Sequence, residues 1–101
     1  MYTIIWRYKI LQEHEAAFVA GYGPEGEWVR FFHGAEGYHG TELLRDHTER
    51  YTFVTIDRWE SAEAYNAFAD ANAEEYERID EKYAAMCVSE VRLGDFDTAS
   101  A

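Results

Sequence analysis

Two side chains in the middle of the sequence have the chemistry of a proton-transfer pair. His39 lies in the segment GYHGTELLRD, and Asp57 lies in the segment RYTFVTIDRWE. A carboxylate next to an imidazole holds its tautomer and raises its basicity, which is the arrangement that a general base needs. We therefore take His39 and Asp57 as candidate catalytic residues, with His39 as the base. This assignment requires the two segments to be neighbouring strands.

The two segments have the composition of an antiparallel hairpin, because both are rich in β-branched and aromatic residues and the polar turn DHTER separates them. If the turn consists of these five residues, His39 lies opposite Asp57. A tighter turn leaves His39 beside Trp59 and diagonal to Asp57. Both registers place the pair on one face of the sheet. The alternative is a polar pair without a catalytic role.

Aromatic side chains near this pair would supply apolar walls and stacking surfaces for a flat substrate. The candidate substrate-binding residues are Trp6, Tyr8, Phe32 and Trp59. The sequence does not fix which side of the first strand faces the pocket, and Trp59 could instead belong to the core. No HxxxH, HExxH or paired-cysteine spacing occurs in the sequence, so no metal site is predicted. The single cysteine, Cys87, is expected to be a buried small apolar residue.

Strands and helices are predicted to alternate around these residues. YTIIWRYKI at residues 2–10 and CVSEVRLGDF at residues 87–96 have the alternation of strands, and they flank the hairpin on either side in the sequence. Helical spacing of apolar residues begins at Gln12, and the glycines and proline of GYGPEG predict a break in that helical region. Ser61 is the expected N-cap of a second helical region, which Asn72 is expected to interrupt.

The resulting order, β, α, β, β, α, β, predicts the fold class. It is typical of an α+β ferredoxin-like split βαβ sandwich, with a four-stranded antiparallel sheet and helices on one face. The domain is expected to span residues 1–95, and residues 96–101 are expected to form a C-terminal tail. Both faces of the hairpin carry sizeable apolar groups, so we expect a second copy of the chain to cover the sheet face that lacks helices.

The charge balance excludes several classes of partner. The net charge of −11 argues against nucleic acid, which is bound by clustered Lys and Arg, and against an anionic membrane surface. No apolar run approaches the roughly 20 residues that span a bilayer. The first residues, MYTIIWRYKI, lack the charge pattern of a signal peptide, so the expected location is the cytoplasm.

The segments WRYKI, GYHGTELLRD and YTFVTIDRWES resemble the antibiotic biosynthesis monooxygenase (ABM) family of dimeric α/β-barrel proteins. The resemblance covers residues 2 to about 93 and implies a homodimer formed through the sheet face, with a small aromatic or apolar ligand bound between sheet and helices. It implies a cofactor-independent monooxygenase that acts on a small hydroxylated aromatic or quinol-like substrate. Two alternatives remain open: a non-catalytic dimer that binds a small ligand, and an oxygen-independent isomerase or cyclase of the same fold.

Haem is the cofactor that the resemblance brings into question, because some proteins of similar shape degrade haem. Those proteins use an asparagine on the first strand, a tryptophan on the third and a histidine on the second helical region. Trp59 matches the tryptophan, whereas YTIIWRYKI contains no asparagine and SAEAYNAFADAN contains no histidine. The expectation is therefore that no cofactor is used, and haem is disfavoured.

Overall fold

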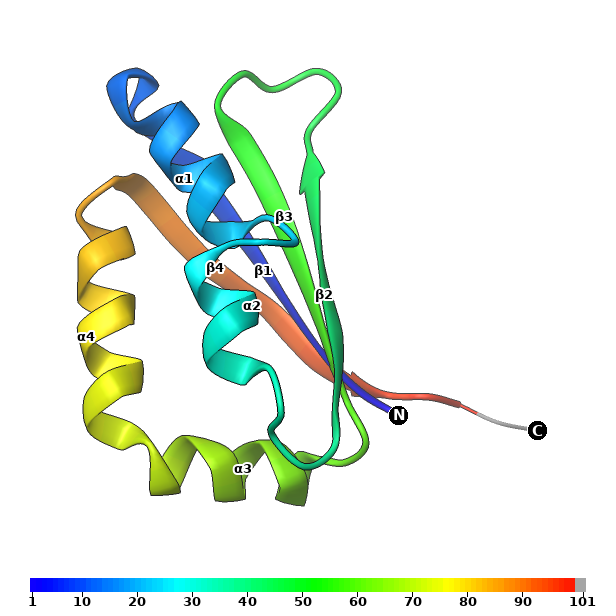
Figure 1. Ribbon diagram of the computed structural model, residues 1–101. Coiled ribbons are helices and arrows are strands. Elements are labelled where there is room, and N and C mark those ends of the chain that lie inside the picture. Colours follow the sequence, from blue (N-terminus) through cyan, green and yellow to red (C-terminus); the bar gives the residue numbers. More distant parts are fainter. Residues whose placement is uncertain (100–101) are drawn as a thin grey trace.

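The computed structural model describes residues 1–99 and consists of one four-stranded antiparallel sheet with helices on one face (Figure 1). The strands are β1 (Tyr2–Ile10), β2 (Tyr38–Arg45), β3 (Thr52–Trp59) and β4 (Cys87–Asp97). The helical elements are the 3-10 turn η1 (Gln12–His14), α1 (Glu15–Tyr22), α2 (Glu27–Phe32), α3 (Ala62–Ala71) and α4 (Ala73–Ala84). This order confirms the predicted α+β ferredoxin-like fold.

The sheet has the strand order β2-β3-β1-β4, so the first and third strands are central. β1 pairs along its whole length with β4, and most of its length also pairs with β3. Among the described strand residues, the buried ones lie on the central strands, whereas β2 and β4 form the edges. A side chain on β1 or β3 that points toward the helices is therefore held from both sides by neighbouring strands.

Both helical regions are interrupted where the sequence predicted a break. α1 ends before Gly23, and α2 begins after Gly26. A Cβ atom at Gly26 would lie 2.3 Å from the carbonyl oxygen of Gly21, so only glycine permits this close turn. Asn72 separates α3 from α4 and donates from its side-chain amide to the carbonyl of Phe68. Ser61 caps α3 by accepting a hydrogen bond from the Ala64 amide, as predicted.

The core is a single aromatic-rich layer between the sheet and the helices. Its fully buried side chains include Phe18, Phe53, Trp59 and Ile79, each at most 1 % exposed. Aromatic rings are in contact throughout this layer, for example Phe18 and Tyr22 with ring centroids 4.2 Å apart. These contacts hold α1 and α4 against the sheet. None of the described helices combines the length and the apolar character needed to cross a membrane.

No helix covers the outer face of the sheet (Figure 1), and several apolar side chains are exposed on it in the single chain. Leu44, Val91 and Phe96 are each between 44 % and 51 % exposed. Leu44 on β2 pairs with Val54 on β3. Val54 also pairs with Arg7 on β1, and Arg7 pairs with Val91 on β4. This cross-strand row is therefore apolar on β2, β3 and β4 and charged at Arg7 on β1.

The C-terminal strand is longer than predicted. Phe96 and Asp97 pair with Thr3 and Tyr2, although the sequence analysis assigned residues 96–101 to a tail. The pairing with β1 continues because Tyr2 donates a hydrogen bond to Asp95 over 2.7 Å, which ties the start of the chain to β4. The last two residues of the predicted tail lie outside the described residues.

Candidate active site

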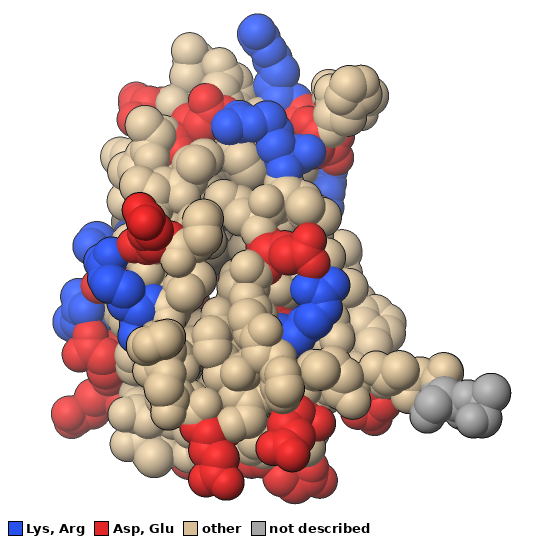
Figure 2. All heavy atoms as spheres, turned by 45° about the vertical axis from the view of Figure 1, so that its right-hand side comes forward, with Lys and Arg blue, Asp and Glu red and all other residues tan. Residues whose placement is uncertain are grey.

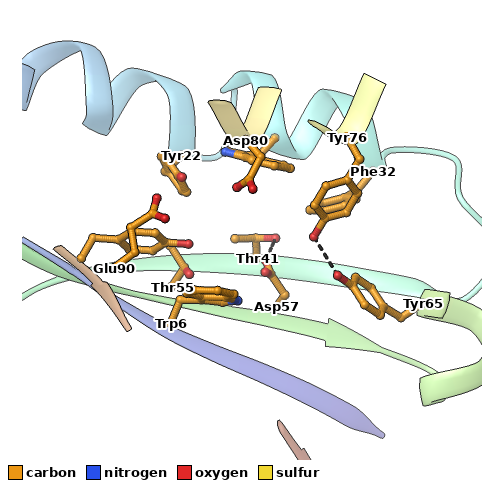
Figure 3. A pocket seen from close by; sticks show the side chains of 12 residues that line it. Trp6, Tyr22, Phe32, Thr41, Thr55, Asp57, Tyr65, Tyr76, Asp80 and Glu90 are labelled. Atoms are coloured by element: carbon orange, nitrogen blue, oxygen red, sulfur yellow. Dashed lines mark hydrogen bonds between the residues drawn. The ribbon is translucent and has the colours of Figure 1, made fainter. Parts of the chain in front are cut away.

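A cavity of about 170 Å³ lies between the helix-facing side of the sheet and the helices (Figure 3). A cavity of about 150 Å³ is large enough to bind benzene, so this volume suits a small aromatic ring. The sheet contributes the lining residues Trp6, Tyr8, Thr41, Thr55, Asp57 and Glu90. The helices contribute Tyr22, Trp28, Phe32, Tyr65, Tyr76 and Asp80.

Asp57 is the ionisable group at the base of this cavity. It lies on central strand β3, and its carboxylate accepts a hydrogen bond of 2.6 Å from the Thr41 hydroxyl on β2. Burial raises the pKa of Asp57 from 3.8 to about 6, and the Thr41 hydrogen bond partly opposes that rise. The described residues that line the cavity include no Lys, Arg or His that would stabilise the carboxylate. A carboxylate with this pKa is able to accept and release a proton near neutral pH.

Tyr38 extends the hydrogen-bonded chain that ends at Asp57. Its hydroxyl lies 2.6 Å from the Thr41 hydroxyl. Thr41 has a single hydroxyl proton and donates it to Asp57, so Tyr38 is the donor to Thr41. The chain Tyr38 to Thr41 to Asp57 fixes the orientation of the carboxylate and satisfies one of its two oxygens.

The predicted contact between His39 and Asp57 is wrong. β2 pairs with β3 in the register Thr41 with Asp57, Gly40 with Arg58 and Tyr38 with Trp59. His39 is the extra residue of a β-bulge, and its side chain is exposed rather than part of the cavity lining. The bulge also places both Tyr38 and Thr41 on the helix-facing side. Gly40 is the feature of the sequence that indicates this bulge, because a glycine inside a strand often marks one. In the structure Gly40 has a φ of 121°.

The structure brings three of the four predicted aromatic residues to the cavity. Trp6, Tyr8 and Phe32 line it, and the rings of Trp6 and Tyr8 stack with centroids 6.1 Å apart. Trp59 is completely buried and is not among the lining residues. Its ring packs edge-on against Phe32 at 5.4 Å, so it supports the cavity wall from behind. The substrate-binding role of all four residues and the catalytic role of His39 stay predictions.

Several polar lining residues were not recognised in the sequence. Tyr65 and Tyr76 lie at helical spacing typical of a helix that packs on a core, yet their hydroxyls form a 2.8 Å hydrogen bond at one end of the cavity (Figure 3). Asp80 and Glu90 were not singled out, and no periodicity distinguishes them from the many surface acids. Thr41 lies on the same face as Asp57 in the predicted hairpin, so the pattern of alternation was sufficient to find it.

The fold and the cavity define an α+β domain of the ferredoxin-like type with an acid/base group beneath an aromatic pocket. The sequence matches the family model described as "antibiotic biosynthesis monooxygenase" (ABM) over residues 1–81. The chain therefore belongs to the ABM family. The match confirms the resemblance that the strand segments indicated.

Solved structures of similar shape support the same fold. A mutant form of SnoaB, a cofactor-independent oxygenase from Streptomyces nogalater, superposes with a TM-score of 0.81 at 17% identity, covering 99% of this chain and 94% of SnoaB. An antibiotic biosynthesis monooxygenase structure has a TM-score of 0.76 at 18% identity, covering 99% of this chain and 100% of the other. A Pseudomonas aeruginosa protein has a TM-score of 0.69 at 16% identity, covering 98% and 94%. A search of curated protein sequences finds no match.

Proposed function

We propose that the protein is a cofactor-independent monooxygenase that oxidises a small hydroxylated aromatic or quinol-like substrate, with Asp57 as the general base. The observation that carries this proposal is the carboxylate of Asp57 beneath an aromatic cavity, with a pKa of about 6. Membership of the ABM family supports the reaction type. SnoaB, which has a similar fold, is a cofactor-independent oxygenase.

The reaction begins when Asp57 removes an acidic proton from the ring-activated carbon of the substrate. The resulting anion is electron-rich and passes electrons to O2 without a metal or flavin. A carbon–oxygen bond then forms, the oxygen–oxygen bond breaks, and one oxygen atom leaves as water while the other becomes a carbonyl oxygen. In an anthrone, or in the keto tautomer of a phenol or quinol, the reacting CH2 group is thereby oxidised to C=O and O2 is fully reduced, so atoms and electrons balance.

The aromatic walls would assist this step by excluding water. Trp6 and Tyr8 offer parallel ring faces from β1, and Phe32 closes the opposite side from α2. A water-poor site strengthens the interaction between Asp57 and the substrate proton, because the effective dielectric constant is low. The Thr41 hydrogen bond would keep the carboxylate oriented toward the ligand during proton transfer.

Haem fits this cavity poorly. Haem iron is held by His, Cys, Met or Tyr, and among the described lining residues only the tyrosines belong to that set. Burial raises the pKa of Tyr8, Tyr22 and Tyr76, which disfavours the phenolate form that ligates iron. The propionates of haem would also meet the carboxylates of Asp80 and Glu90. The residues that line the cavity therefore do not fit haem.

We propose that the chain forms a homodimer through the outer face of the sheet. Exposed apolar side chains cover this face, including Leu44, Val91 and Phe96. Exposed apolar side chains on both edge strands are costly to leave in water, and a second copy would bury them. In such a dimer the helices and the cavity stay on the outside of each sheet.

Oxygen uptake by purified protein that has been treated with a chelator tests the reaction. The substrates are a panel of anthrones, naphthoquinols and related phenols, and the product carbonyl is measured together with the oxygen consumed. We expect one O2 consumed for each carbonyl formed, loss of uptake in Asp57→Asn, and normal uptake in the control Asp70→Asn, which alters an exposed acid on α3. Substrate turnover without oxygen would instead favour an isomerase or cyclase, and binding without turnover would favour a ligand-binding protein.

A further inference from the structure

We propose that the cavity selects aromatic ligands that carry no negative charge, and that Asp80 and Glu90 reject carboxylate-bearing analogues at its mouth. This inference rests on the proposed function in that it concerns the same cavity. It adds the charge class of the substrate and two residues that determine it.

Three carboxylates from three different elements face the cavity. Figure 3 shows Asp57 on the sheet, Asp80 reaching down from α4 and Glu90 on β4, arranged around one space. Asp80 and Glu90 are exposed residues, whereas the neighbouring lining residue Thr55 is only 2 % exposed. The two acids therefore mark the solvent side of the cavity, and any ligand passes them on its way to Asp57.

The acidic groups in the cavity lack cationic partners. No described lining residue is a Lys, Arg or His. Lys82, on the same helix as Asp80, forms an ion pair with Glu27 at 2.8 Å, and Arg78 also pairs with Glu27. Burial and the charge of Asp80 raise the pKa of Glu90, which reflects repulsion between the two acids. A carboxylate on a ligand would add a further like charge, and such a juxtaposition weakens binding strongly.

Two buried polar atoms in the cavity wall favour a ligand that is polar as well as uncharged. The Thr55 hydroxyl and the Trp28 indole N–H have no hydrogen-bond partner among the described residues, although Thr55 is 2 % exposed and Trp28 is 6 % exposed. The Tyr8 hydroxyl is near Thr55 and the Tyr22 hydroxyl is near Trp28, but neither pair meets the geometry of a hydrogen bond. Buried polar groups normally have partners.

A neutral ligand oxygen would satisfy these groups. The indole N–H of Trp28 can only donate, so it requires an acceptor such as a carbonyl or phenol oxygen. Asp57 requires a donor such as a phenol hydroxyl, because an ionised carboxylate only accepts. A hydroxylated aromatic ketone or phenol has both kinds of group, and its hydrogen bonds do not need a negative charge.

The test compares two ligands of nearly the same shape, 6-hydroxy-2-naphthoic acid and 6-hydroxy-2-naphthamide. Binding is measured by isothermal titration calorimetry at pH 8, where Asp57 is ionised. We expect the amide to bind at least about tenfold more tightly than the acid. Equal or tighter binding of the acid would overturn the proposal, and so would the absence of binding by both ligands at millimolar concentration.

Substitutions at the mouth identify the residues responsible. Asp80→Asn combined with Glu90→Gln is expected to improve binding of the acid several-fold and to change binding of the amide by less than about threefold. The matched control is Glu81→Gln, which removes an exposed charge next to Asp80 that does not line the cavity. An unchanged preference in the double variant, with an unchanged thermal transition, would overturn the assignment to these two residues.

The binding experiment separates this inference from the proposed reaction, because neither naphthalene ligand needs to be oxidised. Preference for the amide without any oxygen uptake from the substrate panel would leave the charge selection intact and remove the oxygenase reaction. Oxygen uptake together with equal binding of the acid and the amide would leave the oxygenase reaction intact and remove the charge selection.

Discussion

Asp57 is buried in a position that destabilises its ionised form, although the proposed reaction needs that ionised form as the base. Its side chain lies on a central strand, within the layer that packs against the helices, and its hydrogen bonds in the described structure come from Thr41 alone. The low polarity that raises its pKa to about 6 also makes its ionised form costly in the folded state. A site that holds such a group is a candidate for function, because strongly shifted pKa values concentrate at functional sites.

The first prediction concerns the stability cost of Asp57. Its folded pKa is raised above the unfolded value of 3.8, so the native state binds the proton more tightly and stability is lost as the pH rises from about 4 to about 6. Asp57→Asn removes this loss and is expected to stabilise the protein by about 3 kcal/mol at pH 8, but by little at pH 4. Urea unfolding at both pH values measures the difference, and a variant less stable than the wild type at pH 8 would contradict this reading.

The second prediction concerns Thr41, which acts on catalysis through Asp57. Thr41→Val removes the hydrogen bond that lowers the pKa of Asp57, so we expect that pKa to rise and the pH dependence of kcat/KM to shift to higher pH. Thr41→Ser retains the hydroxyl and should restore the wild-type profile. A Val variant whose turnover falls without any shift of the profile would indicate a purely structural role.

At the scale of elements, the bulge in β2 decides which residues reach the cavity. It turns His39 outward and brings Tyr38 and Thr41 to the helix-facing side, where they form the chain to Asp57. Gly40 permits this conformation with a φ of 121°, a region that other residues rarely adopt. The bulge therefore places the hydroxyl of Thr41 within hydrogen-bonding distance of the Asp57 carboxylate.

The third prediction tests this role of the bulge. Gly40→Ala is expected to cost about 1–3 kcal/mol of stability, because an L residue is strained at this backbone conformation although no atom obstructs its Cβ. The measurement is the shift of the urea midpoint. An unchanged midpoint would mean that the strand readily adopts another backbone conformation at this position.

A substitution at His39, on the same bulge, distinguishes Asp57 from His39 as the catalytic base. With Asp57 as base and His39 exposed on the bulge, His39→Ala is expected to change turnover by less than a few-fold. The sequence-based assignment of His39 as base expects a loss of about 10²-fold or more. Steady-state kinetics of this one variant decides between the two assignments.

The elements were predictable from the sequence and the local geometry of the site was not. Alternation and helix breaks were sufficient for the fold, because Ser61, Asn72 and the glycines act on their immediate neighbours. The register near His39 was predicted from uninterrupted pairing, and one bulged residue changed the partner of Asp57 to Thr41. Asp80 and Glu90 reach the cavity because of the way α4 and β4 pack, and the local sequence pattern does not predict that packing.

At the scale of the whole molecule, charged and apolar groups occupy different regions. Figure 2 shows a face on which acidic and basic side chains gather toward the margins around a broad uncharged centre. Exposed apolar residues cover the outer sheet face. The net charge of −11 keeps whole molecules apart in solution, so association is expected only where apolar surface outweighs repulsion.

The fourth prediction concerns the dimer. Val91→Asp places a charge among the exposed apolar side chains of the outer face, on edge strand β4, and is expected to convert a dimer into a monomer. Size-exclusion chromatography with light scattering measures the mass, and Ala67→Asp on the exposed side of α3 is the control. A wild-type protein that is monomeric at micromolar concentration would contradict the proposed interface.

The most direct test of the central claim is the pH dependence of kcat/KM for oxygen-dependent turnover in the wild type and in Asp57→Asn. The account predicts activity that rises with pH through about 6 in the wild type, because Asp57 must be ionised to accept the proton. It also predicts a loss of at least about 10²-fold in the variant, together with loss of the limb near pH 6. A variant that keeps both its activity and this limb would show that another group is the base.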